Sequence, residues 1–115
     1  KGKTIEAARA DFGKAVEMIL KKTKERVDKI RNKGGKVIFL RLPSTGQLHE
    51  IENTFTPRKN FWDRILETTG APGIHFEDHE ELNGFNCPEW SHLNRKDASE
   101  FTKRLMPILA KHLLK

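Results

Sequence analysis

The sequence lacks the features that identify membrane, secreted and disulfide-stabilised proteins. No apolar run approaches the roughly 20 residues that a transmembrane helix requires, so we expect no membrane span in this chain. The first residues show no apolar core followed by a small-residue cleavage site, so we expect no signal peptide there. Cys87 is the only cysteine, which excludes an internal disulfide and leaves the redox compartment open.

Length and composition favour one domain with a modest core. The chain has 115 residues, of which 33% are charged and 36% are hydrophobic. These proportions are typical of a helix-rich protein with well-solvated faces. The chain enters a helical pattern almost at once and has no initiating methionine, so we expect it to be part of a longer protein.

The net charge of +6 is concentrated in one part of the chain. Residues 1–36 contain 12 Lys or Arg against 5 Asp or Glu, whereas residues 47–89 contain 3 against 9. Binding of single-stranded nucleic acid usually combines basic residues with aromatic side chains that stack on bases, and the basic run at 21–33 contains no aromatic residue. We therefore interpret this run as the solvated face of a helix and expect no nucleic-acid partner.

The first 43 residues predict a helix followed by a strand. Apolar side chains recur at helical spacing over 4–32, with Gly13 as a possible break and the glycines at 34–35 as the stop. The stretch KVIFLRLP at 36–43 is mainly apolar and rich in β-branched and aromatic residues, which suits a strand covered on both faces. The organisation is therefore a helical segment at 1–33 and a strand-helix-strand-helix segment at 36–115.

The remaining elements alternate in the same way. Residues 44–59 predict a long irregular connection, with a helical turn at 48–52. A helix over 61–69 follows, capped by Asn60 and closed by Gly70, and GIHFED at 73–78 predicts a second strand. Asn94 is a candidate N-cap for the final helix, with Asp97 at its third position, and Pro107 is expected to kink or split that helix.

This alternation of helices and strands predicts an α/β fold with three layers around a parallel sheet. Successive parallel strands joined by helices adopt right-handed crossovers, which place helices on both faces of the sheet. Two strands alone cannot form such a sheet. We therefore expect an incomplete part of a larger domain, whose missing strands come from a preceding N-terminal segment or from a second copy of the chain.

One stretch, CPEWSHLN at 87–94, is the strongest candidate for a catalytic site. In α/β proteins ligands gather at the carboxyl ends of parallel strands, where the segments after Pro43 and Phe76 should meet this turn. Glu89 can orient the imidazole of His92 through one ring nitrogen, which leaves the other nitrogen to accept a proton from a hydroxyl nucleophile. The alternative is a turn that only caps the following helix, with Trp90 filling core.

The order of elements in the last 80 or so residues resembles the C-terminal half of the SGNH or GDSL hydrolase superfamily. The resemblance rests on KVIFLRLP, on GIHFED, and on a DxxHLN-type turn that this chain writes as EWSHLN at 89–94, followed by ASEFT at 98–102. It implies a three-layer, flavodoxin-like or SGNH-like fold. It also implies an esterase or acyl-transfer activity on an ester such as an O-acetylated carbohydrate, without a cofactor or a metal. His92 would be the general base and Glu89 the residue that orients it.

Two departures from the family pattern limit what this chain can do alone. The family acid is normally Asp, and Glu89 carries one more methylene. The serine block and the glycine and asparagine of the oxyanion hole are absent, so acyl transfer would lack its largest electrostatic contribution. We therefore expect the chain alone to be inactive and the nucleophilic serine to lie outside it. The alternative function is a non-catalytic α/β module for binding or assembly.

Other polar residues receive structural interpretations. Ser44 lies in no G-x-S-x-G motif, so we assign it to turn formation. Arg41 is expected to meet an anionic substrate or to pair with Glu77 or Asp78. Cys87 is expected to be a small buried thiol. A zinc site would draw on three residues, but a turn among them spoils the shared face that ligation requires: His75, Asp78 and His79.

Overall fold

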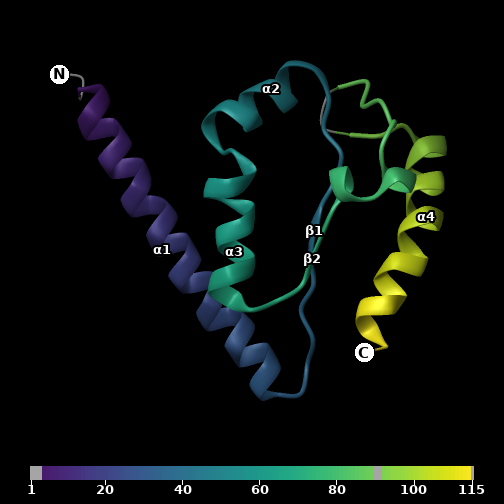
Figure 1. Ribbon diagram of the computed structural model, residues 1–115, viewed down its shortest axis with the longest axis horizontal. Helices are drawn as coiled ribbons and strands as arrows, with labels where there is room; N and C mark the ends of the chain where they lie inside the picture. Colours follow the sequence, from purple (N-terminus) through teal and green to yellow (C-terminus); the bar gives the residue numbers. More distant parts are fainter. Residues whose placement is uncertain (1–3, 90–91, 115) are drawn as a thin grey trace.

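The computed structural model describes residues 4–89 and 92–114 (Figure 1). Of the described residues, 68% lie in helices and 6% in strands. The four α-helices and two strands of this part, in chain order, are α1 (Ile5–Asn32), β1 (Phe39–Arg41), α2 (Gly46–Phe55), α3 (Trp62–Thr69), β2 (Gly73–His75) and α4 (Arg95–Leu113). Short 3₁₀ turns lie at Arg58–Asn60, Phe76–Asp78 and Glu80–Leu82.

Helix α1 is continuous and packs on α3 through its C-terminal half. Thr4 caps it, because its hydroxyl accepts a hydrogen bond from the backbone N–H of Ala7 at 3.0 Å. Gly13 does not interrupt the helix. Near its end, the guanidinium of Arg31 donates to the carbonyl oxygens of Thr69 and Gly70 at 2.8 and 2.9 Å. These bonds satisfy carbonyls at the end of α3 and tie the two helices together.

The two predicted strands pair in parallel, as expected, but each is only three residues long. Phe39 lies opposite Gly73, and Arg41 lies opposite His75. The predicted second strand at 73–78 is cut short because Phe76–Asp78 forms a 3₁₀ turn. In the described part of the chain these two strands form the whole sheet.

The predicted three-layer α/β fold with a parallel sheet, of flavodoxin-like or SGNH-like type, was therefore wrong. The molecule is mostly helical around one short strand pair, with α3 and α4 on opposite sides of it (Figure 1). The apolar run at 36–43 has strand composition, but a strand forms only where a partner supplies hydrogen bonds. Only its central residues have such a partner, so composition overestimated the extent of the sheet.

The local signals at helix ends were more informative. Gly70 ends α3 with a left-handed φ of 70°, as predicted, and the side chain of Asn94 accepts from the backbone N–H of Asp97 at 2.8 Å. Asn60 does not cap α3, because it belongs to the preceding 3₁₀ turn and Phe61 takes the cap position. Pro107 does not split α4, which continues past it to Leu113.

The core lies between β2 and α4. Ile74 and Leu82 are fully buried, and the Phe101 ring meets the Phe85 ring edge-on at a centroid distance of 5.6 Å. Phe76 and Ile108 complete this cluster. It contains the buried side of β2, so it holds the strand pair against the last helix.

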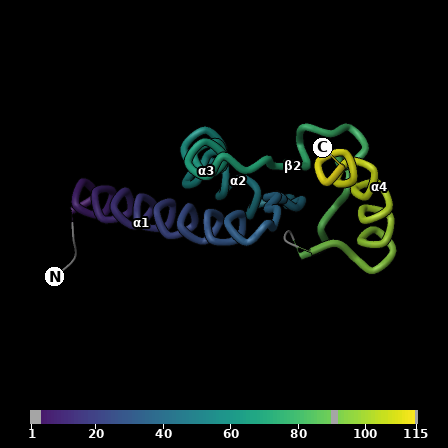
Figure 2. The backbone as a smooth tube through the Cα atoms, turned by 90° about the horizontal axis from the view of Figure 1, so that it is seen from below, coloured from purple at the N-terminus to yellow at the C-terminus, as the bar shows by residue number. Residues whose placement is uncertain are grey.

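Outside this core the chain is spread out, as the view in Figure 2 shows. Its radius of gyration is 16.5 Å, against about 13 Å for a compact domain of this length. Its accessible surface is 8622 Å², which exceeds the roughly 6,500 Å² of a folded monomer of this mass by about 2,100 Å². Large apolar side chains such as Ile5, Phe12 and Phe55 are therefore left more than half exposed.

Two glycines predict opposite effects of the same substitution. Gly13 lies inside α1 with open space where a Cβ would stand, so Gly13→Ala should raise the free energy of unfolding by about 1 kcal/mol. A Cβ at Gly73 would stand 2.7 Å from side-chain atoms of Trp62 and Leu66, so Gly73→Ala should lower it by about 1–3 kcal/mol. Urea denaturation measures both, and a Gly73→Ala variant as stable as the parent would contradict this packing.

Candidate functional site

A network of polar side chains lies where the two strands end. Arg41 is the last residue of β1 and His75 is the last residue of β2, and the register places them opposite each other. The loop after β1 leads directly into α2, so the first half of that helix stands beside the same edge (Figure 1). This is the carboxyl edge of a parallel pair, where the sequence predicted a site.

Glu52 on α2 is the centre of the network. Its Oε1 atom accepts a hydrogen bond from the Ser44 hydroxyl at 2.6 Å and lies 2.8 Å from a terminal guanidinium nitrogen of Arg41. Burial raises the pKa of Glu52, but the hydrogen bonds from Ser44 and Arg41 outweigh burial and hold that pKa below its usual value. Glu52 is therefore a carboxylate at neutral pH. The prediction that Arg41 pairs with Glu77 or Asp78 was wrong.

The Ser44 hydroxyl is buried at this edge and hydrogen-bonded to neighbouring side chains. It is 4% exposed, and its oxygen also lies 3.1 Å from Nδ1 of His49. The Ser44 hydroxyl has one proton, which it donates to the Glu52 carboxylate, because a carboxylate can only accept hydrogen bonds. We therefore assign a proton to Nδ1 of His49, which donates a hydrogen bond to the Ser44 oxygen. The Ser44 proton is thus engaged with Glu52 and not with a histidine base, which fits the predicted role in shaping the turn.

His75, the last residue of β2, lies at the same edge, and its side chain is buried. Its Nδ1 atom accepts the backbone N–H of Glu77 at 3.1 Å, and its ring meets the Trp62 ring edge-on at 5.3 Å. Burial lowers the pKa of His75, and the positive charge of Arg58 lowers it further. His75 is therefore neutral in the folded protein at neutral pH.

Glu77 and Asp78 make this edge acidic. Arg58 donates two hydrogen bonds to the Asp78 carboxylate, at 2.6 and 2.5 Å, and these bonds hold the pKa of Asp78 below its ordinary value. One oxygen of Glu77 lies 3.6 Å from Nε2 of His49 and the other 3.7 Å from Nε2 of His75, which are electrostatic rather than hydrogen-bond distances. Among the described residues, no group of three or more His, Cys, Asp or Glu could hold a metal ion.

Cys87 fastens the predicted catalytic turn to this edge. Its backbone N–H donates to the Thr45 hydroxyl, which in turn donates to the Cys87 carbonyl, both at 3.2 Å. Its thiol lies 3.5 Å from the carbonyl oxygen of Pro43. Cys87 is 1% exposed, as predicted for a buried thiol, and burial raises its pKa. The start of the 87–94 turn is therefore anchored to the loop that follows β1.

The two predicted catalytic residues lie on the exposed part of this turn. Glu89 follows Cys87 by two residues, and His92 stands two residues before the N-cap of α4; both are exposed. Trp90, which the alternative interpretation placed in the core, lies outside the described residues. The pairing of Glu89 with His92 stays a prediction.

His49 and Glu52 were not among the residues predicted from the sequence. Residues 44–59 predicted an irregular connection with one helical turn, whereas α2 spans Gly46–Phe55. On a helix, residues three apart lie on the same face, so His49 and Glu52 both turn toward Ser44. The spacing S-x₄-H-x₂-E was visible in the sequence, but it acquires meaning only once a helix is assigned.

Comparisons with known proteins give no match: no family model, no curated protein and no solved structure matches this chain. No helix in the portion that the structure describes is long and apolar enough to cross a membrane, in agreement with the prediction from the sequence. The function must therefore be inferred from this site and from the sequence motifs.

The buried and ion-paired groups predict a loss of stability on acidification. The folded pKa of His75 lies below its ordinary value of 6.5, so its contribution is complete above that pH and is lost as the pH falls toward the folded pKa. The pKa values of Glu52 and Asp78 are also lowered, so their contributions are lost at lower pH, as the pH falls through their folded pKa values.

Unfolding midpoints measured between about pH 8 and pH 3 should therefore fall in two stages. His75→Phe keeps an aromatic ring at this position and should remove the first stage. The matched variant His79→Gln should retain it, because the structure gives that ring no comparable burial. A profile in which His75→Phe leaves the first stage intact would contradict the account.

Proposed function

We propose that this chain is the C-terminal part of an SGNH-like esterase or acyl-transfer protein, and that its carboxyl edge forms one wall of the active site. The observation that supports the proposal most is the anchoring of the 87–94 turn. Hydrogen bonds between Cys87 and Thr45 hold the start of this turn against the loop after β1. The motif that resembles the family's catalytic turn thus begins at the edge where a parallel pair collects ligands.

His92 acts in this proposal as the general base. It accepts the proton of a serine hydroxyl as that oxygen attacks the ester carbonyl, and it returns the proton to the departing alcohol. Glu89 orients the imidazole in place of the family's Asp, and both residues lie on the exposed part of the turn. A water molecule, activated by the same imidazole, then releases the acyl group.

The nucleophilic serine comes from outside these 115 residues. Ser44 is a poor candidate, because it is buried and its proton is donated to Glu52. The family's oxyanion donors are also absent from the chain. We infer that a preceding N-terminal segment, or a second copy, pairs with an open edge of the two-stranded sheet and brings the serine to His92.

An ester of a polyhydroxyl compound, such as an O-acetylated carbohydrate, fits the polar character of this edge. Arg41 is held in place by Glu52 and by the carbonyl oxygen of Leu42, at 2.8 and 3.0 Å. Glu77 is exposed at the same edge, with one carboxylate oxygen 3.6 Å from Nε2 of His49. This edge therefore offers a hydrogen-bond donor, Arg41, and an acceptor, Glu77. Both suit sugar hydroxyls, which donate and accept hydrogen bonds.

A non-catalytic binding or assembly module is the second candidate. The large exposed surface favours it, because the described chain shows about 2,100 Å² more than a compact domain of its mass. In that case the polar network would serve only to order the loop after β1. The two candidates differ in whether His92 is needed for turnover.

Hydrolysis of p-nitrophenyl acetate by the intact natural protein separates them. His92→Gln should lower kcat by about 10²- to 10⁴-fold, because it removes the general base. His112→Gln, at the far end of α4, is the matched control and should leave kcat unchanged. Glu89→Gln should lower kcat less and shift the acidic limb of the pH–rate profile.

Two results would count against the enzyme. An intact protein with full activity in the His92→Gln variant would overturn the role of this residue. An intact protein without any His92-dependent turnover would favour the binding or assembly module.

A further inference from the structure

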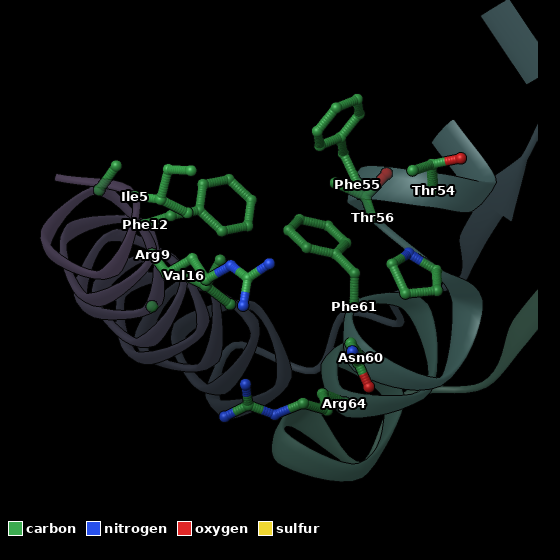
Figure 3. Close-up of a pocket in the computed structure, with 13 residues that line it drawn as sticks. Ile5, Arg9, Phe12, Val16, Thr54, Phe55, Thr56, Asn60, Phe61 and Arg64 are labelled. Atoms are coloured by element: carbon green, nitrogen blue, oxygen red, sulfur yellow. The ribbon is translucent and has the colours of Figure 1, made fainter. Parts of the chain in front are cut away.

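A second surface, away from the polar edge, is an open groove between the first half of α1 and the segment from α2 to α3. Its volume is about 860 Å³, and aromatic rings from both walls dominate it. Phe12 comes from α1, whereas Phe55 and Phe61 come from the opposite wall, and Figure 3 shows these rings facing the space between the helices. The network around Glu52 contributes none of its residues to this groove.

The groove walls expose several large apolar side chains. The side chains of Ile5, Phe12 and Phe55 are 75%, 52% and 70% exposed. Contiguous apolar patches of this kind mark interaction sites on soluble proteins, whereas single exposed apolar residues are ordinary. We therefore expect a binding partner or ligand to cover this surface.

The charges in the groove have one sign. Arg9 and Arg64 both line it, and no Asp or Glu does. In Figure 3 the guanidinium of Arg9 extends from α1 toward Phe61, and that of Arg64 lies below it. Arg64 also contacts Glu17, which lies outside the lining. Glu17 offsets the charge of Arg64, so Arg9 supplies most of the positive charge of the groove, which favours a ligand with negative charge beside an apolar face.

We infer that this groove binds an acidic amphipathic helix of a partner polypeptide. A helix satisfies its own backbone hydrogen bonds, so it can enter an apolar groove that offers few polar groups, whereas an extended segment would leave backbone groups unpaired. The groove follows α1 from Ile5 to Val16, which is about 17 Å at 1.5 Å per residue, or three helical turns.

The charge and the area of the molecule favour this occupant over two others. A second copy would bring no excess of negative charge to the two arginines through its own α1, since residues 5–16 carry two positive and two negative side chains and residues 1–36 carry 12 against 5. A single fatty acid would cover only a small part of the excess exposed surface. A standard protein interface instead buries about 800 Å² on each partner, and the excess exposed surface of about 2,100 Å² is large enough to supply that area. This inference does not depend on the proposed ester chemistry.

Two synthetic helical peptides of three to four turns test it on the 115-residue chain. Both carry leucines at i, i+4 and i+7, and the flanking positions are Glu in one peptide and Lys in the other. Fluorescence anisotropy should show one-to-one binding of the acidic peptide, with an affinity about tenfold or more above that of the basic peptide.

Charge reversal in the groove provides the decisive comparison. The double variant Arg9→Glu with Arg64→Glu should reverse the preference, so that the basic peptide binds more tightly. The matched double variant Lys22→Glu with Lys29→Glu changes the net charge equally on the exposed face of α1 outside the groove, and it should keep the original preference. A gain of binding to the basic peptide cannot result from a failure to fold.

Four results would overturn the inference. They are equal binding of both peptides, loss of the preference in the control variant, binding of laurate without binding of either peptide, and concentration-dependent dimerisation of a chain that binds neither peptide. The first would indicate binding through the apolar face alone, the second attraction by net charge alone, the third a lipid site, and the fourth a second copy.

Discussion

The parallel ladder between β1 and β2 is the constraint on which the rest of this structure depends. It is only three residues long on each strand, yet it joins the α1 and α3 side of the molecule to the α4 side. Its last pair sets Arg41 opposite His75, and the two segments that follow carry the remaining polar residues of the edge. Burial of Ile74 against α4 holds the ladder in place. Loss of this strand pairing would separate the residues of the candidate site and would also disrupt the fold.

The polar edge illustrates how satisfied hydrogen bonds restrict chemistry. Ser44 and His49 lie 3.1 Å apart, a distance that would suit a nucleophile and its base. The Glu52 carboxylate changes that interpretation, because it accepts a hydrogen bond from the Ser44 hydroxyl at 2.6 Å and is itself paired with Arg41. In the proposed function the chemistry is therefore assigned to the exposed turn that carries His92, and that turn begins at Cys87, which is hydrogen-bonded to the loop beside the Ser44 network.

Local signals in the sequence predicted the end of α3 and the start of α4, but not the start of α3 or the extent of α2. The order of the elements predicted two strands and their parallel pairing. Gly70 and the Asn94 cap depend on neighbours a few residues away, so they can be recognised without knowledge of the fold. The extent of the sheet depends on partners distant in the sequence, and the apolar run at 36–43 could not reveal that most of it has none. The Glu52 network was missed for a related reason, since only one helical turn, at 48–52, was predicted where α2 spans Gly46–Phe55.

The direct test of the central claim is to locate the nucleophile. A fluorophosphonate reacts covalently with an activated serine, and mass spectrometry of the labelled intact protein identifies that residue. The account predicts one labelled serine outside these 115 residues, with labelling that is lost in His92→Gln. Label on Ser44, or labelling that is unaffected by His92→Gln, would contradict it.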